Sequence, residues 1–221
     1  MKALKTLVPA AVLAAALAVS ASANAATTIS IGAAHDGGSI VDLASGGTNA
    51  GILGAVLGNF DINNISAVFG PLPDLLSSNA LDASNNGGGG TLDVYVTIQG
   101  LTAAMAHTFK SSLTENVLSA GWSVVESTYL NLDNSKYGTL TQLASHPFDT
   151  IGTSVQVASP AVDGTYSITE LYHITAVGAG NAQSTIDVSG VPEPATWGLM
   201  ILGFGGIGAM VRNRRRQAAF A

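Results

Sequence analysis

Alternation of apolar and polar residues dominates the middle of this chain. Within residues 92–99, every second residue is aliphatic, beginning with Leu92. The same period of two recurs at 122–127 and at 166–175. Successive side chains of a strand point to opposite faces of a sheet, so this period predicts β-strands with one buried face. Shorter stretches of the same kind, rich in β-branched and aromatic residues, predict further strands at 27–31, 65–69, 154–158 and 184–188.

Turn-forming residues separate these predicted strands. The separators are Asp36-Gly37-Gly38, the run from Asn85 to Gly90, Asp133-Asn134 and Asp163-Gly164. An Asp-Gly pair between two strand-like runs is typical of a tight hairpin, which we predict at Asp163-Gly164. Residues 50–57 are small and apolar and fit either a loop or a strand, while 72–81 has room for one short helical turn.

Many short strands with Gly- and Asn-rich turns indicate a mainly β fold. We predict an antiparallel β-sandwich or jelly-roll-like domain over residues 26–190. Its length suits one domain, and it shows no convincing internal repeat. On this prediction a signal-peptide helix flanks the domain on the N-terminal side and a transmembrane helix flanks it on the C-terminal side.

The N-terminus has the features of a secretory signal peptide. Lys2 and Lys5 precede an apolar stretch from Leu7 to Val19, and Ala23-Asn24-Ala25 offers small residues to a signal peptidase. We expect residues 1–25 to direct export and to be removed after Ala25. An uncut N-terminal membrane anchor is the alternative.

The C-terminus has three parts in a fixed order. A Pro-Glu-Pro segment at 192–194 precedes an apolar, glycine-rich run from Trp197 to Val211, and basic residues follow at once. The basic residues are Arg212, Arg214, Arg215 and Arg216. The run is short for a membrane span, which needs about 20 residues, but arginine side chains can reach the interface. Positive charge stays on the cytoplasmic side, so this segment predicts a single-pass anchor in the inner membrane.

Residues 191–216 resemble the PEP-CTERM sorting signal of Gram-negative bacteria, in its PEPxxWA form. The resemblance rests on Pro192, Glu193, Pro194 and Trp197, followed by the apolar run and the arginines, and it covers only the end of the chain. Gly198 stands where that form usually has alanine. The same region is also known as the "ice-binding protein C-terminal domain", a name that is not evidence of ice binding.

The resemblance implies that another protein handles this chain. Exosortase, an integral membrane protease-transpeptidase, is thought to recognise the Pro-Glu-Pro region and to remove the helix and the tail. The mature protein then reaches the cell surface or an exopolysaccharide matrix. Pro192 and Pro194 favour an extended backbone, as a protease cleft requires. Pro192, Glu193, Pro194 and Trp197 are thus substrate residues of a foreign enzyme, and Trp197 also suits a membrane interface.

Charge and cysteine content limit what the middle domain does. Residues 26–190 hold thirteen acidic and two basic residues, a net charge of −11 against −6 for the whole chain. Such a surface repels phosphate backbones, so we expect no nucleic-acid partner. The chain has no cysteine, which excludes disulfides, thiol nucleophiles and cysteine-based metal sites.

Catalytic patterns are weak. The histidines (His35, His107, His146 and His173) lack the context of a catalytic triad or of a metal motif. Glu126 and Glu170 occupy similar positions on two predicted strands. If those strands are neighbours, the two carboxyls meet on one face, as glycoside hydrolysis requires. Two solvated strand residues are the more ordinary interpretation.

Two kinds of ligand remain open. Asn131 and Asp133 alternate like the first ligands of a calcium loop, and Asp61 lies in a second oxygen-rich stretch, although such residues also form turns. No EF-hand is present, because Lys136 replaces the glycine that its loop needs. Tyrosines in or beside predicted strands offer a platform for sugar rings or simply flank the core; these are Tyr95, Tyr129, Tyr166 and Tyr172.

These observations favour an exported, non-enzymatic protein with a structural or adhesive role in an exopolysaccharide layer. A secreted β-sandwich enzyme acting on carbohydrate is one alternative, and a calcium- or carbohydrate-binding module is another. No cofactor is expected unless calcium binds. A concave cleft with two facing acids would favour the enzyme, whereas a closed sandwich with acids spread over its surface would favour the structural role.

Overall fold

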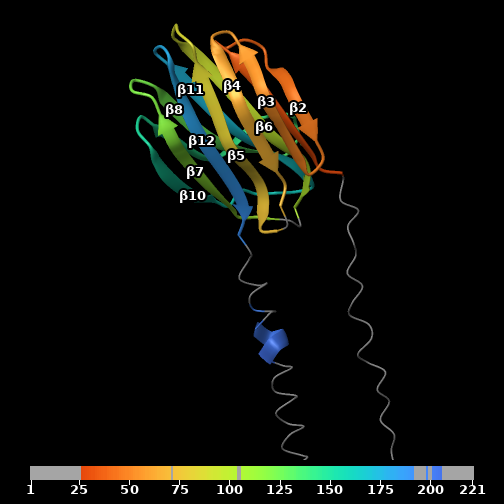
Figure 1. Cartoon of the computed structure of the whole chain (residues 1–221). Coiled ribbons are helices and arrows are strands. Elements are labelled where there is room, and N and C mark those ends of the chain that lie inside the picture. The colour runs from red at the N-terminus through yellow and green to blue at the C-terminus, as the bar shows by residue number, and fades with distance from the viewer. Residues whose placement is uncertain (1–25, 71, 104–105, 192–197, 199–200, 206–221) are drawn as a thin grey trace, which may run out of the picture.

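Two six-stranded antiparallel sheets pack face to face in the computed structural model (Figure 1). The structure describes residues 26–70, 72–103, 106–191, 198 and 201–205. In order across the first sheet, which we call sheet A, the strands are β2 (Val41–Gly46), β1 (Thr28–His35), β6 (Gly90–Thr102), β11 (Thr165–Ala176), β8 (Ser123–Asn131) and β9 (Thr141–Phe148). Sheet B consists of β10 (Gly152–Ala158), β7 (Phe109–Leu118), β12 (Gly180–Gly190), β5 (Asp74–Asn85), β4 (Phe60–Val68) and β3 (Asn49–Leu57). The predicted mainly β sandwich is confirmed.

The alternation in the sequence marks the face that each strand turns to the core. In β6 the aliphatic residues from Leu92 to Ile98 are fully buried between the sheets. The β1–β6 register sets Ile29 opposite Ile98 and Ile31 opposite Val96, so like faces meet. Edge-to-face aromatic pairs, Phe109–Tyr166 and Phe60–Trp122, add to the packing.

Local expectations from the sequence were wrong at two places. Residues 72–81 do not form a helical turn, because most of them belong to the long strand β5. Asp163-Gly164 is not the tip of a hairpin: β10 lies in sheet B and β11 in sheet A, so the connection crosses between sheets. Gly164 nevertheless has the positive φ (67°) of a turn. The Asn85–Gly90 run likewise crosses between sheets, from β5 to β6. The ambiguous stretch 50–57 is a strand, β3.

Both ends of the sandwich domain leave from one end of the sandwich, which we call its base (Figure 1). The connection from β6 to β7 lies there, since Thr28 pairs with Gln99 near the end of β6 and Gly190 pairs with Phe109 at the start of β7. Of the residues after Val191, the structure describes only 198 and 201–205, which are helical. Among the described residues, no helix has the length and apolar character needed to cross a bilayer.

Candidate functional site

The sorting signal begins where the fold ends. β12 lies between β7 and β5 in sheet B, so it is hydrogen-bonded on both sides. Its end is tied as well: the backbone N–H of Gly190 donates to the carbonyl of Pro73 (2.7 Å), and that of Val191 donates to the carbonyl of Thr108 (2.8 Å). The folded strand therefore runs directly to the residue that precedes the Pro-Glu-Pro segment, with no linker between them.

The sequence-predicted sorting residues lie outside the described part of the chain. These are Pro192, Glu193, Pro194 and Trp197 of the signal, and Arg212, Arg214, Arg215 and Arg216 of the basic stop. Their roles as substrate residues and as a membrane stop remain predictions.

Glu126 and Glu170 do come together on one face, but that face is the interior. In the β11–β8 register, Glu170 lies opposite Thr128 and Glu126 lies opposite Tyr172. Both glutamates have no exposed surface. The more ordinary interpretation from the sequence, two solvated strand residues, was wrong because these strands turn this face toward sheet B rather than toward water.

A third glutamate, Glu115, faces the same interior from sheet B. It is 1% exposed, and one of its carboxylate oxygens accepts a hydrogen bond from the hydroxyl of Ser184 (2.5 Å). We call Glu115, Glu126 and Glu170 the buried carboxyl cluster. All four carboxyl oxygens of Glu126 and Glu170 lack a hydrogen-bond partner, as does the second oxygen of Glu115. Sequence reasoning missed Glu115. A usable signal was its spacing of two from Leu113, which places both side chains on the same face of β7.

Burial shifts all three carboxyls of this cluster toward their protonated form. It raises the pKa of Glu126 to about 9, with a further contribution from the negative charge of Glu115. Burial also raises the pKa of Glu115 to about 7 and lifts that of Glu170 well above its ordinary value. Removing a carboxylate from water disfavours its charged form, and no described ion pair offsets that cost for these residues.

Hydroxyl groups join the two sheets beside the cluster. The phenol of Tyr172 in β11 shares a hydrogen bond with the hydroxyl of Ser78 in β5 and accepts one from the backbone N–H of Ile186 (3.0 Å). The hydroxyls of Ser111 and Thr128 form another link from sheet to sheet (2.8 Å). The interior is thus partly polar, and Glu126 and Glu170 expose no surface there that a glycan could reach.

The three calcium candidates form hydrogen bonds within the fold, and Asp61 lies on a different sheet from the strand that ends at Asn131. The side chain of Asn131 is fully buried, and it donates to the carbonyl of Gly138 (2.8 Å) and accepts from the N–H of Leu140 (2.8 Å). A carboxylate oxygen of Asp133 accepts from the N–H of Ser135, as in an Asx turn. Asp61 lies on β4 of the other sheet and accepts from the side chain of Asn86. Within the described residues, no group of three acidic or histidine side chains has a metal-binding arrangement.

The predicted tyrosine platform does not form as a set. Tyr166 and Tyr172 are fully buried, because their positions in β11 face the core. Tyr95 lies on the outer face of sheet A, where its ring contacts that of Tyr137 with centroids 5.8 Å apart. The loop between β8 and β9 thus covers part of the face that Tyr95 would have offered to a sugar.

His173 has a carboxylate partner within hydrogen-bond distance. Nδ1 of His173 lies 2.5 Å from a carboxylate oxygen of Asp93, and this contact raises the pKa of the imidazole. The two residues are cross-strand neighbours on β11 and β6. Opposite charges at directly opposed strand positions form a cross-strand ion pair, as is common in sheets.

Comparison with known proteins bears on the C-terminus alone. A search of curated proteins finds no significant match to the chain. A family model described as the PEP-CTERM protein-sorting motif matches residues 190–216. Such a motif marks an exported protein that is anchored at the membrane before exosortase-type machinery processes it. The chain therefore carries a PEP-CTERM sorting motif, and this motif starts at the last residue of β12.

Proposed function

We propose that this protein is a non-enzymatic component of the cell surface or of the extracellular polysaccharide layer. Its sandwich is exported, held at the inner membrane by the segment after Trp197, and delivered when exosortase removes that segment. The observation that carries the proposal is the direct junction between β12 and the sorting motif. Because the motif begins at the last residue of β12, removal of the segment after the Pro-Glu-Pro region leaves the described sandwich intact.

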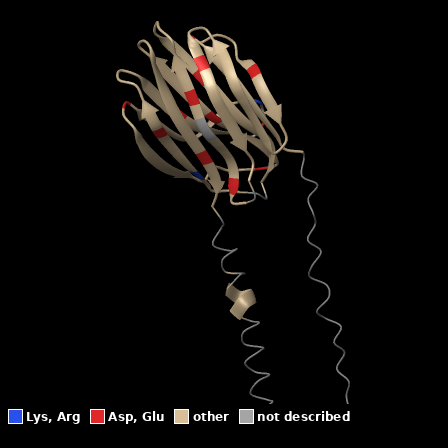
Figure 2. Ribbon diagram, viewed as in Figure 1, with Lys and Arg blue, Asp and Glu red and all other residues tan. Residues whose placement is uncertain are grey.

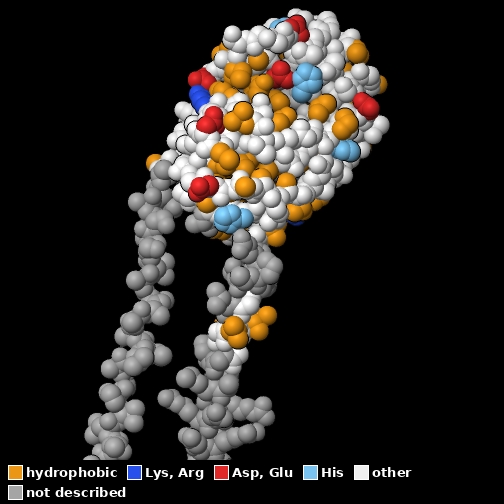
Figure 3. All heavy atoms as spheres, turned by 180° about the vertical axis from the view of Figure 1, so that it is seen from behind, with side chains coloured by type: hydrophobic (Ala, Val, Ile, Leu, Met, Phe, Trp, Pro, Cys, Tyr) orange, Lys and Arg blue, Asp and Glu red, His pale blue; other side chains and the backbone are white. Residues whose placement is uncertain are grey.

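The distribution of acidic residues supports a structural rather than a hydrolytic role. Acidic positions are spread over several strands instead of facing one another across a cleft (Figure 2). The three acids of the buried carboxyl cluster, Glu115, Glu126 and Glu170, are closed off inside the fold. From behind, the surface shows hydrophobic side chains in scattered groups between uncharged polar ones, with no single large apolar patch (Figure 3).

The outer face of sheet B supports contact with a hydrated polymer. Short polar side chains line it and bond across strands, as Asn63 does with Asp82 (3.2 Å) and Asn116 with Thr185 (3.2 Å). Such a face offers many amide and hydroxyl groups at regular strand spacing. Adhesion to polysaccharide would then rest on many weak hydrogen bonds rather than on one deep site.

Mass spectrometry of the C-terminus of the exported protein tests the delivery step. The wild type is expected to end before Trp197 and to leave the membrane fraction. The double variant Pro192→Ala/Pro194→Ala is expected to stay in the membrane fraction with its C-terminus intact, because the extended Pro-Glu-Pro segment is lost. Pro160→Ala, in the connection between β10 and β11, is the matched control and should be processed normally. A mature wild type that still contains Trp197–Val211 would refute the proposal.

Incubation of the purified mature protein with exopolysaccharide from the producing cells tests its role. Binding without new reducing ends is expected. Release of oligosaccharides that is lost in Glu126→Gln or Glu170→Gln would show that the interior opens and that the protein is a hydrolase.

A further inference from the structure

The four sheet edges of the sandwich are not equally protected. On one side, the side-chain amide of Gln156 in β10 bonds the backbone of Ser145 in β9: it donates to the carbonyl (2.7 Å) and accepts from the N–H (3.4 Å). On the other side, β2 carries Asp42, which forms an ion pair with Lys136 (2.7 Å). Bridged edges and charged edges resist pairing with another chain.

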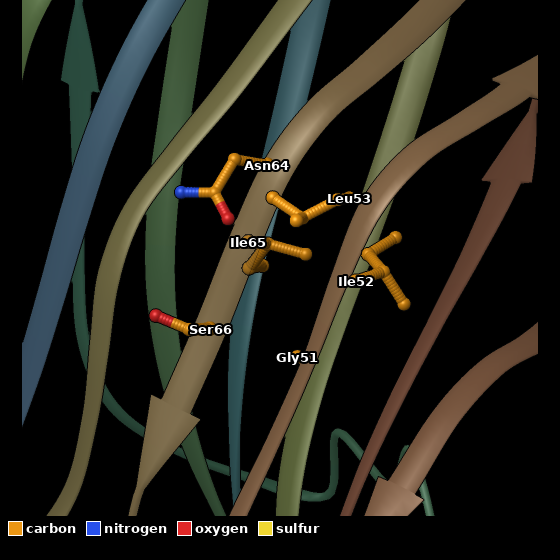
Figure 4. Close-up of a pocket in the computed structure, with 6 residues that line it drawn as sticks. All are labelled: Gly51, Ile52, Leu53, Asn64, Ile65 and Ser66. Carbon is orange, nitrogen blue, oxygen red and sulfur yellow. The ribbon is translucent and has the colours of Figure 1, made fainter.

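The remaining edge, β3, has none of these protections. Its nine residues contain no charged residue and no proline, and its one hydrogen-bonded neighbour is β4. Leu53 and Val56 expose 83% and 75% of their surface, while Gly51 and Gly54 add no side chains. Figure 4 shows the side chain of Leu53 near Asn64 and Ile65 of β4, with Gly51 further along β3 lining the same pocket. A long, uncharged edge of this kind is a template for strand addition.

The order of large and small residues in β3 fits a second copy of itself. The alternation of exposed and half-buried residues changes phase at Leu53 and Gly54, since both of these are exposed. A two-fold axis between them therefore pairs exposed residues with exposed ones and half-buried residues with half-buried ones. The opposed pairs are Leu53 with Gly54, Gly51 with Val56, Ile52 with Ala55, and Ala50 with Leu57.

Each of those pairs sets a large side chain against a small one. Strands in a sheet lie about 4.8 Å apart, and directly opposed side chains are close neighbours, so this order fills space without collision. A two-fold axis repeats every contact: if Leu53 of one copy opposes Gly54 of the other, Gly54 of the first also opposes Leu53 of the second.

We propose that β3 pairs antiparallel with β3 of a second copy, which joins the two B sheets into one continuous sheet. The interface buries Leu53 and Val56 of both copies, which the single molecule leaves in water. The acidic surface opposes this association, so salt should strengthen it by screening the repulsion. The pairing is independent of the sorting step.

Cysteine cross-linking in intact cells tests the pairing, because the chain has no cysteine of its own. Leu53→Cys places one thiol per copy next to the axis, with the two Cα atoms about 5–6 Å apart, within disulfide range. The matched control is Val155→Cys, at a position on β10 that is 55% exposed, on the other edge of the same sheet. After mild oxidation we expect roughly tenfold more covalent dimer from Leu53→Cys than from the control, since only the former sits within bonding distance of its copy.

Sedimentation of the processed protein gives a second measure. The wild type is expected to show a concentration-dependent dimer that increases with salt, and Leu53→Lys should remain a monomer, because it sets two positive charges beside each other at the axis. Leu53 is exposed, so this variant keeps its fold, which circular dichroism verifies. Equal cross-linking in both cysteine variants together with a monomeric wild type would overturn the proposal. Cross-linking of Leu53→Cys to a different protein would also overturn it and would assign the edge to that partner.

Discussion

Glu126 shows how much one side chain depends on the sheet that faces it. Its place on an amphipathic strand suggested water, yet it is fully buried beside a second carboxyl. Glutamate is rarely buried without a partner, and burial at these positions favours the neutral carboxylic acid. The folded state therefore binds protons at the buried carboxyl cluster more tightly than the unfolded chain does.

Stability should fall as pH rises. In the unfolded chain these glutamates lose their protons near their ordinary pKa of 4.5, whereas Glu126 in the fold keeps its proton up to about 9. Between these values the folded state binds more protons, so each such group lowers the free energy of unfolding by about 1.4 kcal/mol per pH unit. The stabilisation is complete below pH 4.5 and is lost as pH rises through the folded pKa. Urea denaturation at pH 5, 7 and 9 measures the slope.

The variant Glu126→Gln should flatten this dependence, because an amide has the shape of the neutral acid and does not ionise. Asp149→Asn, an exposed acid in the connection between β9 and β10, is the control and should leave the slope unchanged. His146 lies opposite Glu126 in the β8–β9 register, so His146→Gln separates the contribution of this imidazole from that of the glutamate. A wild-type stability that does not change between pH 5 and 9 would contradict the assignment.

At the scale of elements, the loop between β8 and β9 fastens the outer face of sheet A. Tyr137 takes up a positive φ (58°) and packs against Tyr95, and its N–H donates to the hydroxyl of Thr97 (3.2 Å). Glycine at position 32 makes room for it, since a Cβ there would lie 2.7 Å from the tyrosine ring. The loop that resembled a calcium site is thus organised by side-chain contacts and by the amide of Asn131.

Asn131→Ala should destabilise the protein by about 1–3 kcal/mol, because the partly buried hydrogen bonds of its side chain to the backbone of Gly138 and Leu140 are lost. Thermal melts with calcium and with a chelator measure this change and also test calcium binding. Asn86→Ala, whose amide bonds Asp61 at an exposed site, is the control and should cost far less. A large stabilisation of the wild type by calcium that is absent in Asn131→Ala would show that the loop is a calcium site after all.

At the scale of the whole molecule, β12 connects the domain to its sorting motif. Since it lies between β7 and β5, sheet B is divided without it. A chain that stops after Val191 keeps every strand and should be exported, folded and free of the membrane. Its melting temperature should lie within about 2–4 °C of that of the mature wild type, a range that corresponds to 1 kcal/mol or less for a domain of this size.

A chain that stops after Gly178 lacks β12 and should not fold. Protease resistance and near-ultraviolet circular dichroism of the exported products distinguish the two truncations. A folded product from the shorter chain would show that the central strand is dispensable and that the junction with the motif carries no structural constraint.

Prediction from the sequence succeeded where the information is local. The strands at 92–99 and 166–175 follow from their period of two, and the sorting motif follows from a contiguous set of residues near the C-terminus. Residues 72–81 were misjudged because the adjacent residues Leu75 and Leu76 are both buried, so this part of β5 lacks the period of two. The Asp-Gly turn at 163–164 was identified, but its chemistry does not say which sheet the next strand joins.

The amino-acid order alone determined that this protein is mainly β, acidic, free of cysteine and equipped with a C-terminal sorting motif, because each of these properties resides in neighbouring residues or in composition. The tertiary structure alone decided that three glutamates share the interior, that Asn131 holds a loop, and that β3 is the unprotected edge. Those properties depend on which strands pair and which faces meet, and such contacts join residues that lie far apart along the chain.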